Sequence, residues 1–342
     1  MLLLRGIRST TQDMGPKILI ASGITLLTLN IYLLTQPSAS PRIDPIPAAP
    51  LFIPYGESTC LPQDETNLAE NSVAKRGLCR KYSPFLTRQM RIATVTAHFG
   101  TPKEHYQQAL QTHLLHSLIH GTETHVLCDA IVDDLWNKPA FILRLLMDEM
   151  MKPDEERLEW IMWVDRDTII LDQCRPASSF LPRYSNETYL LVTNDFNGLN
   201  NGVFMLRVNS WAVELFNTIL AFRHYKPEVE LRFTEQSAME LVIKEDQFKD
   251  KIKFVPQYWF NGYPEGEPEK FKDRRDQNDL QEEHVRRGDF LVHFAGLPGK
   301  GKAIRGWLDM LAQLEDVWKT KSAQRDVDRD IAAFWHESVE PW

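Results

Sequence analysis

The sequence predicts an α/β domain with a mostly parallel sheet, because short apolar runs alternate with helical stretches from about residue 90 onward. The composition agrees with a folded globular protein, since the 342-residue chain is 43% hydrophobic and 25% charged. A net charge of -8 and a pI near 5.7 exclude nucleic acid as the main partner, because binding a phosphate backbone needs a basic surface.

The predicted elements follow from hydrophobic period and from cap residues. We expect a helix over 103–121 to end at Gly121, a helix over 138–151 to hold Pro139 in its first turn, and Ser210 to cap the helix over 210–225. A further helix is predicted over 234–245. The predicted strands are 91–99, 124–130, 159–165, 188–195, 252–260 and 290–296.

Two charged segments are expected to lie outside the predicted sheet. Residues 264–289 are strongly charged and almost free of apolar residues, which is typical of a solvated loop or an exposed helix. The last segment, 321–342, predicts a peripheral helix and tail.

The N-terminal region predicts a membrane anchor over residues 18–34. As a helix these 17 residues span about 26 Å, close to the ~27 Å core of a thin early-secretory membrane. Arg5, Arg8 and Lys17 precede the run, so we expect 1–17 to be a cytosolic tail and the remainder to lie in the lumen. A cleaved signal peptide and a buried helix are the alternatives.

The next segment, 35–89, is expected to be a luminal stem, because seven prolines lie between residues 37 and 62. It leads to a catalytic domain over 90–320. An anchor, a stem and a globular domain are the plan of a membrane-tethered luminal enzyme. A sequon at Asn186 is accessible to glycosylation in such a compartment.

The four cysteines form no C-x-x-C pair, which argues against a zinc ribbon or a thioredoxin-like site. Cys60 and Cys79 flank a polar segment, so they are candidates either for one disulfide or for free thiols. Cys128 and Cys174 lie near predicted core segments and are expected to be buried thiols.

Asp165 and Asp167 directly follow an apolar strand, at the kind of strand end where α/β sheets bind ligands. Alternation along an extended chain places both carboxylates on one side, with Arg166 opposite. Two adjacent carboxylates repel unless a cation lies between them, and oxygen ligands suit Mg²⁺ or Mn²⁺. The alternatives are a solvated strand end and a phosphatase whose nucleophile is the first aspartate. About 70 residues of the domain precede the pair, which disfavours the phosphatase.

Two later segments hold further candidate site residues. Residues 194–211 are dense in short polar side chains suited to sugar hydroxyls and in glycines that permit close backbone approach, although such a composition also favours turns. These residues are Asp195, Asn197, Asn200, Asn201, Gly198 and Gly202. Residues 288–307 place His293 in a strand, which indicates a third metal ligand. The cations Lys300, Lys302 and Arg305 follow it and indicate a diphosphate clamp.

Five blocks, in matching order over roughly residues 90–312, resemble glycosyltransferase family 34, the fungal galactosyl/mannosyltransferases related to plant xyloglucan xylosyltransferases. The blocks are "WIMWVDRDTII", "NDFNGLNNGVFMLR", "TEQSAMELV", "VPQYWFNGYP" and "GDFLVHFAG". The resemblance implies a GT-A fold, Golgi residence as a single-pass type II protein, and retaining transfer of galactose or mannose from UDP-galactose or GDP-mannose to a glycan. It also allows a homo- or hetero-oligomer, or a non-catalytic partner of a Golgi mannosyltransferase complex.

The resemblance further implies roles for individual residues. Asp165, Asp167 and His293 would hold Mn²⁺ (Mg²⁺ is the alternative), and Gln236 would lie beside the anomeric carbon. Glu235 is the first candidate nucleophile by motif position. Asp195 is the second, and same-face attack by the acceptor, without a nucleophile from the enzyme, is favoured. The sequence departs from the family at Arg166, where a small residue is frequent, and in lacking a cysteine after His293.

Overall fold

The computed structural model describes residues 52–57, 60–62, 65–85, 90–182, 187–275 and 279–336, which all belong to one compact unit, Ala48–Trp342. The predicted anchor over 18–34 and the sequon residue Asn186 lie outside the described ranges. Within those ranges, no helix is both long enough and apolar enough to cross a membrane.

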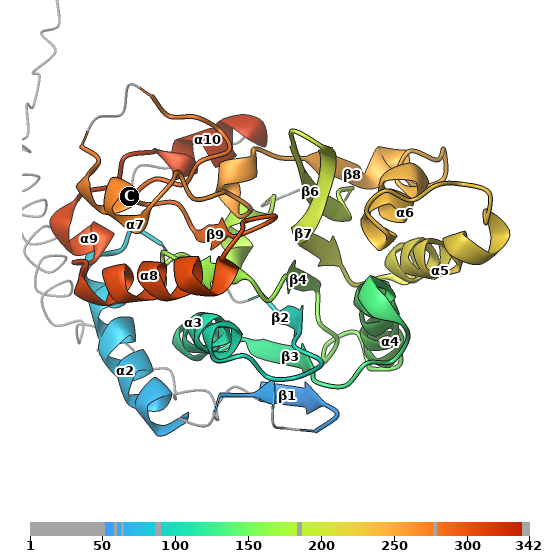
Figure 1. Cartoon of the computed structure of the whole chain (residues 1–342), viewed down its shortest axis with the longest axis horizontal. Helices are drawn as coiled ribbons and strands as arrows, with labels where there is room; N and C mark the ends of the chain where they lie inside the picture. Colours follow the sequence, from blue (N-terminus) through green and yellow to red (C-terminus); the bar gives the residue numbers. More distant parts are fainter. Residues whose placement is uncertain are drawn as a thin grey trace, which may run out of the picture. The chain divides into compact units, whose positions relative to one another are not determined.

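A seven-stranded sheet forms the centre of the unit (Figure 1). Its order is β1-β3-β2-β4-β7-β6-β8, and its pairs are parallel except for β4–β7 and β6–β7. The predicted mostly parallel sheet is therefore confirmed. The strands are β1 (Phe52–Tyr55), β2 (Ile92–Ala97), β3 (Glu123–Leu127), β4 (Trp160–Val164), β6 (Leu190–Asp195), β7 (Gly198–Arg207) and β8 (Ile252–Phe254).

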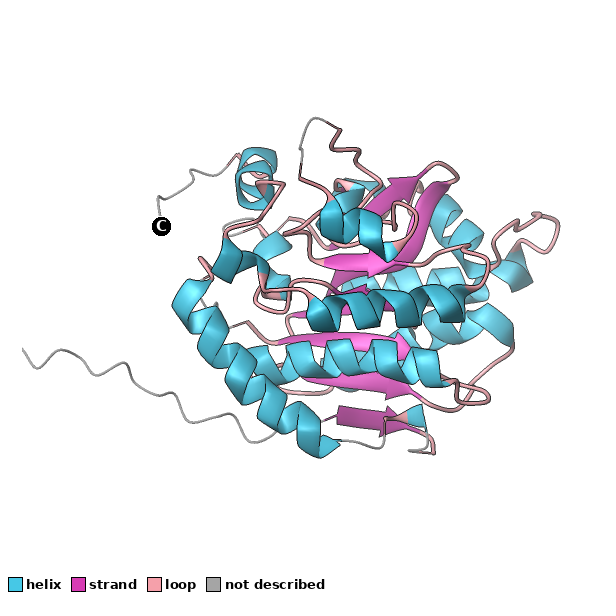
Figure 2. Cartoon of the chain, turned by 60° about the vertical axis from the view of Figure 1, so that its left-hand side comes forward, coloured by secondary structure: helices cyan, strands magenta, loops and turns pink. Residues whose placement is uncertain are grey.

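Helices cover both faces of this sheet, as Figures 1 and 2 show. The α-helices are α2 (Glu65–Tyr82), α3 (Glu104–His120), α4 (Asn137–Met150), α5 (Ser210–Tyr225), α6 (Glu235–Val242), α7 (Pro268–Asp273), α8 (Lys300–Gln313), α9 (Val317–Thr320) and α10 (Val327–Phe334). Short 3-10 helices are η2 (Asp134–Trp136), η3 (Ala177–Phe180), η4 (Lys249–Lys251) and η5 (Gln257–Trp259).

The core divides along the alternation of the strands. On β2, Ala93 and Val95 face a large apolar cluster that includes α4, α5 and α6, whereas Ile92 faces a second cluster with η3, η5 and α10. On β4, Trp160 and Met162 likewise join the second cluster. Because successive side chains point to opposite faces, apolar residues on both faces explain why these strands read as continuous apolar runs.

A second sheet of two strands, β5 (Thr168–Ile170) and β9 (Leu291–His293), lies outside the main sheet. The two strands are antiparallel, and Thr168 pairs with His293. This pairing connects the segment after the two aspartates with a segment more than a hundred residues later. It is the main long-range contact that assembles the candidate site.

Most predicted elements are present, with three local differences. The prediction contains no strand between 195 and the helix over 210–225, but β7 runs through this Asn- and Gly-rich segment and pairs with both β4 and β6. Asn209, not Ser210, caps α5, because its side chain accepts a hydrogen bond from the Ala212 amide. The strand expected over 252–260 ends at Phe254 and gives way to η5.

The folded unit begins earlier than residue 90. β1 pairs in parallel with β3, and α2 packs against α3 near the start of the domain. Both elements fall in the segment expected to be a stem. The proline-rich composition of 37–62 hides one four-residue strand, because Pro54 can lie in β1 where that strand forms the edge of the sheet.

Two disulfides attach this N-terminal part to the domain. Cys60 bonds to Cys128 after β3, and Cys79 in α2 bonds to Cys174 after β5. The suggested Cys60–Cys79 pair is therefore wrong, and so is the expectation that Cys128 and Cys174 are thiols. Sequence neighbourhood misled here, because the true partners are 68 and 95 residues apart and meet only through the sheet.

Candidate functional site

The three predicted metal ligands come together at the carboxyl end of β4. Asp165 follows β4, Asp167 precedes β5, and His293 ends β9 opposite Thr168. One ligand atom from each of the three residues lies within 4.8 Å of the others. The Phe294 amide also donates to the Asp167 carbonyl oxygen over 2.9 Å, which holds the two segments together.

A hydrogen bond to Asn261 orients His293. The distance from His293 Nδ1 to Asn261 Oδ1 is 2.8 Å, and an amide oxygen can only accept, so Nδ1 carries the proton. The Nε2 lone pair then faces Asp167 Oδ1 at 3.5 Å. A carbonyl-type partner on one ring nitrogen is the arrangement that presents the other nitrogen to a metal.

Gly202 makes room for this histidine. A Cβ atom at position 202 would lie 2.2 Å from His293 Cε1, so no other residue fits without movement. The Gly202 carbonyl accepts from the Asp165 amide over 2.8 Å, so the same residue also fixes the first aspartate. The prediction that a glycine here permits close approach agrees with this geometry.

Lys300 lies against Asp167, with Nζ 2.5 Å from Oδ2. Burial opposes ionisation of Asp167, but the charge of His293 in its protonated form and that of Lys300 outweigh it and hold the pKa of its carboxyl well below the usual range. The donor set of two carboxylates and one imidazole fits a divalent cation such as Mn²⁺. A carboxylate that is kept ionised in a buried position is suited to that ligand role.

A second lysine, Lys138, is buried on the other side of Asp165. Its Nζ lies 3.1 Å from Asp165 Oδ1 and 3.3 Å from Glu235 Oε1, and it donates to Asn201 Oδ1 over 3.0 Å. Burial lowers the pKa of Lys138, but the two carboxylates raise it by more. For Glu235, burial together with Asp165 raises the pKa in spite of Lys138.

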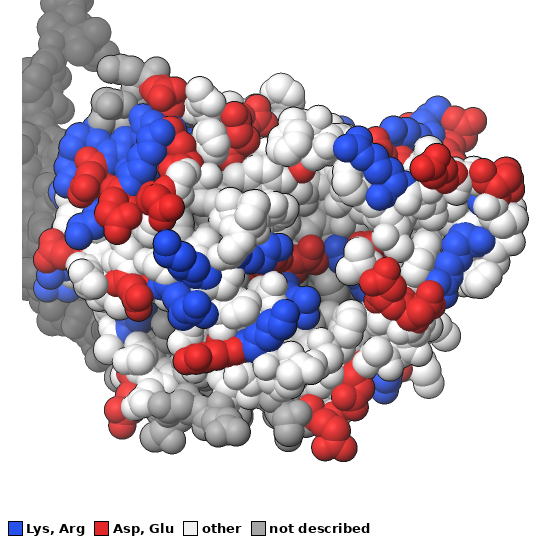
Figure 3. Space-filling model, viewed as in Figure 1, with Lys and Arg blue, Asp and Glu red and all other residues white. Residues whose placement is uncertain are grey.

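Asp165, Asp167, Lys138, Glu235 and Lys300 line a cleft of about 590 Å³ at the carboxyl ends of β2 and β4. Figure 3 shows acidic and basic side chains together in a hollow between α8 and α6. Two non-glycine residues of the lining, Asp134 and Thr234, have φ angles of 48° and 51°. Backbone strain of this kind concentrates where a structure positions functional groups.

Arg166 also belongs to the cleft lining, and its guanidinium lies 4.5 Å from the centre of the Tyr106 ring of α3. The residue that departs from the family pattern is thus stacked on an aromatic face and exposed to the cleft. Its charge is available to an anionic ligand, because the stacking leaves the edge of the guanidinium open to hydrogen bonds.

The remaining predicted residues divide between the cleft and its surroundings. Gln236 lines the cleft, and its Oε1 accepts from the Asn201 amide over 3.2 Å. Asp195 lies outside the lining and accepts from Tyr263 and Asn200. Asn197, Lys302 and Arg305 are exposed and do not line the cleft, so Lys300 is the only one of the three predicted clamp cations that does.

Sequence reasoning missed Lys138, Asn261 and Tyr263. Lys138 stands in the first turn of an apolar helix, where a cation is unfavourable beside the positive end of the helix dipole. A lysine at this unfavourable position indicates that a carboxylate nearby in the fold compensates its charge. The block "YWFNGYP" contains Asn261 and Tyr263, but nothing in its pattern distinguishes residues that hydrogen-bond to site residues from ordinary turn residues.

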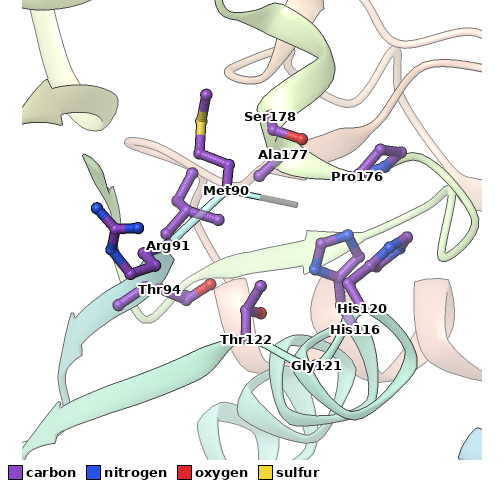
Figure 4. A pocket seen from close by; sticks show the side chains of 12 residues that line it. Met90, Arg91, Thr94, His116, His120, Gly121, Thr122, Pro176, Ala177 and Ser178 are labelled. Atoms are coloured by element: carbon purple, nitrogen blue, oxygen red, sulfur yellow. The ribbon is translucent and has the colours of Figure 1, made fainter. Parts of the chain in front are cut away.

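A second cavity, of about 380 Å³, lies near the amino end of β2 (Figure 4). His116 and His120 of α3 line it, and their Nε2 atoms donate to the carbonyls of Arg175 and Gln173 over 2.8 and 3.0 Å. The twelve lining residues include no carboxylate. The charged cleft at the opposite ends of the strands is therefore the candidate active site.

Comparison with known proteins bears on the cleft. The model of the galactosyl transferase GMA12/MNN10 family matches residues 175–301, which include Asn201, Gln236, His293 and Lys300. Galactomannan galactosyltransferase 1 of Cyamopsis tetragonoloba is 27% identical over 31% of this chain and 30% of its own length. Xyloglucan 6-xylosyltransferase 2 of Arabidopsis thaliana is 25% identical over 47% and 39%, respectively.

The probable α-1,6-mannosyltransferase MNN10 of Saccharomyces cerevisiae is 24% identical over 40% of this chain and 41% of its own length. The chain thus spans less than half the length of the curated relatives it matches. A solved glycosyltransferase involved in glycosylation of the PBCV-1 major capsid has a TM-score of 0.46 and 15% identity, covering 63% of this chain and 98% of that one. The resemblance indicated by the sequence motifs is confirmed: the chain is similar to the galactosyl transferase GMA12/MNN10 family over residues 175–301 and to curated galactosyl-, xylosyl- and mannosyltransferases.

Proposed function

We propose that the protein is a metal-dependent, retaining glycosyltransferase with a GT-A fold that moves a hexosyl unit, galactose or mannose, from a nucleotide sugar to a glycan. The observation that carries this proposal is the convergence of Asp165, Asp167 and His293, because the two aspartates also line a cleft that holds Lys300 and Gln236. Metal ligands, a cation and a polar amide in one hollow supply the requirements for releasing a nucleoside diphosphate.

The leaving diphosphate develops negative charge that the site must neutralise. A divalent cation held by Asp165, Asp167 and His293 supplies Lewis-acid stabilisation when bound. Lys300 and Arg166, which both line the cleft, add charge-assisted hydrogen bonds to phosphate oxygens. Lys300 is paired with Asp167, so a bound phosphate would replace that carboxylate as the anionic partner of the ammonium group.

The sugar is expected to lie beside α6, where Glu235 and Gln236 meet the cleft. Glu235 is committed to an ion pair with Lys138, and Asp195 to hydrogen bonds with Tyr263 and Asn200. Both carboxylates are held by these contacts, although Glu235 Oε2 has no hydrogen-bond partner. This supports attack on the same face as departure, with a phosphate oxygen of the leaving group taking the acceptor's proton. Trapping a glycosylated Glu235 would overturn this mechanism.

The site of action that we propose is the Golgi lumen, with residues 18–34 as a type II anchor. The support comes from the cysteines, because all four are paired in two disulfides. Disulfides persist in oxidising compartments and are rare in the cytosol. Protease protection of the domain in sealed microsomes, measured with and without detergent, tests this orientation. Digestion without detergent would contradict it.

A donor screen tests the activity itself. The full-length protein is incubated with Mn²⁺ and UDP-galactose, UDP-xylose, UDP-glucose or GDP-mannose, and release of nucleoside diphosphate is measured. Asp165→Asn and Asp167→Asn should abolish release and Mn²⁺ binding by calorimetry, whereas Asp148→Asn, an exposed aspartate of α4, should preserve both. Release that survives both site substitutions would refute the metal assignment. Formation of an aspartyl-phosphate at Asp165 from a phosphate ester would instead support the phosphatase.

A further inference from the structure

The turn between β6 and β7 presents an aromatic ring to solvent. Phe196 is 87% exposed, which makes it the most exposed aromatic side chain among the described residues. A phenyl ring in water forgoes about 1.5–3 kcal/mol of burial free energy, so the fold gains little from it. Single exposed apolar residues are common, and the surroundings of this one decide whether it has a role.

The turn is held rigidly on the side of the metal ligands. Asp195 Oδ2 accepts from Tyr263 Oη over 2.5 Å and from Asn200 Nδ2 over 3.0 Å. Asp195 Oδ1 accepts from the Asn197 amide over 2.6 Å, which closes the turn around Phe196. The Tyr263 ring packs edge-on against the His293 ring at 6.0 Å, so the base of the turn is connected to a proposed metal ligand.

The other side of the turn rests on α6. A Cβ at Gly198 would lie 3.0 Å from Glu240 Oε1, and the φ angle of +108° at Gly198 is one that other residues rarely adopt. The first turn of α6 carries Glu235 and Gln236 into the cleft. The turn therefore stands between the helix beside the expected sugar and the histidine beside the expected diphosphate.

The length of β7 sets the reach of this aromatic ring. Asn201 lines the cleft, and the strand from Asn201 back to Gly198 spans about 10 Å at ~3.3 Å per residue, with Phe196 two residues further. One sugar ring in the cleft does not cover that distance, but an oligosaccharide does. Asn194 and Asn197, both exposed, lie on either side of Phe196 in the sequence and carry amide donors and acceptors.

We propose that Phe196 is a stacking platform for a sugar ring of an oligosaccharide acceptor, at least one unit away from the ring that receives the transferred sugar. This inference rests on the proposed function. The C–H face of a pyranose packs on the phenyl face, while the two asparagine amides satisfy its equatorial hydroxyls. An aromatic surface beside polar groups suits a ligand that is apolar on one face and polar at its rim.

The test compares acceptors of different length with the full-length protein and its best donor. The acceptors are α-1,6-mannotetraose and cellotetraose, with mannose and glucose as their single-ring controls. Phe196→Ala should raise the KM for the tetrasaccharide that the protein uses by about tenfold, with kcat and the donor KM unchanged. Phe196→Trp should restore the wild-type KM, and Met151→Ala, at an equally exposed residue, should have no effect.

Three outcomes overturn the proposal. They are an unchanged tetrasaccharide KM in Phe196→Ala, an equal change for single rings, and a shift of oligomeric state by light scattering, which would assign Phe196 to a protein contact. Saturation-transfer NMR of tetrasaccharide binding separates this inference from the proposed function. Binding that depends on Phe196 without any sugar transfer would sustain the platform and refute the activity, whereas transfer that is indifferent to Phe196 would do the reverse.

Discussion

His293 and His116 are both buried imidazoles with one ring nitrogen hydrogen-bonded, and they lie near opposite ends of the central strands. His293 uses Nδ1 for the Asn261 side chain and turns Nε2 towards Asp167. His116 uses Nε2 for a backbone carbonyl, in a cavity whose lining has no carboxylate. The same residue type therefore stands in two environments of different charge.

The difference shows that burial of a histidine does not identify a functional site. Burial is similar at the two positions, and what separates them is a second, ionised group aimed at the free nitrogen. At His293 that group is Asp167, which Lys300 also contacts. At His116 the neighbour is the ring of His120, at 4.4 Å between ring centres. The first arrangement invites a cation, and the second stabilises α3 against the segment after β5.

The largest expected effect is that substitution of His293 lowers activity, whereas substitution of His116 lowers stability. His293→Ala should lower sugar transfer by about 10²–10⁴-fold, because the metal contributes several kcal/mol of transition-state stabilisation. His116→Ala should instead lower the unfolding free energy by about 2–3 kcal/mol, since a buried carbonyl loses its donor, and leave kcat within about twofold. Nucleoside diphosphate release and urea denaturation measure the two quantities. A stable but inactive His116→Ala protein would contradict this division.

A smaller effect is expected from the glycine that accommodates His293. Gly202→Ala places a Cβ 2.2 Å from His293 Cε1, so the ring must turn away from Asp167. Disturbing the orientation of a ligand in this way typically lowers metal affinity about 10–100-fold. Titration of Mn²⁺ by calorimetry gives the affinity.

The control for this substitution is Gly77→Ala in α2. A Cβ there meets nothing within 4 Å, and alanine should raise the unfolding free energy by roughly 0.5–1 kcal/mol. Equal Mn²⁺ affinities in Gly202→Ala and the wild type would show that His293 does not take part in the site as we propose.

Much of the fold could be predicted because the strands of the sheet are apolar on both faces and are separated by helical periods. β2, β4 and α3 all lie where the pattern predicts them. β7 was not predicted, because Asn200, Asn201 and Gly202 have the composition of a turn. Their polarity reflects contacts with the cleft and with His293, so functional demands override strand propensity at this point.

The convergence of Asp165, Asp167 and His293 was predictable, but the residues that support them were not. A repeat of two aspartates after an apolar strand is local, and His293 follows from its strand and the cations behind it. Lys138 and Asn261 act through tertiary contacts with Asp165 and His293, which no spacing along the chain records. The disulfide pairing could not be predicted for the same reason, because Cys128 after β3 and Cys174 after β5 reach their partners only in the folded structure.

The smallest expected effect is a change in how stability depends on pH. Burial lowers the pKa of His116 to about 4 from its ordinary 6.5, although the Arg175 carbonyl opposes the shift. As the pH falls below about 6.5 the unfolded chain is protonated first, so the stability associated with a neutral His116 is present above that pH and is lost towards pH 4. His113, lowered to about 3, adds to this loss. Asp172 and Asp289, raised to about 6 and about 7, oppose it by taking protons in the folded state.

The substitution His116→Gln removes the contribution of His116 to this pH dependence and leaves the other titrating groups in place. Its amide can still donate to the Arg175 carbonyl but does not titrate, so the slope of unfolding free energy against pH between about 5 and 6 should become shallower by about 1.4 kcal/mol per pH unit. Urea denaturation at closely spaced pH values measures the slope. Met90→Leu alters the lining of the same cavity without changing a titrating group and should leave the slope unchanged. If the curves of unfolding free energy against pH were parallel for His116→Gln and the wild type, His116 would have the same pKa in the folded and unfolded states. The contrast with His293 would then rest on geometry alone.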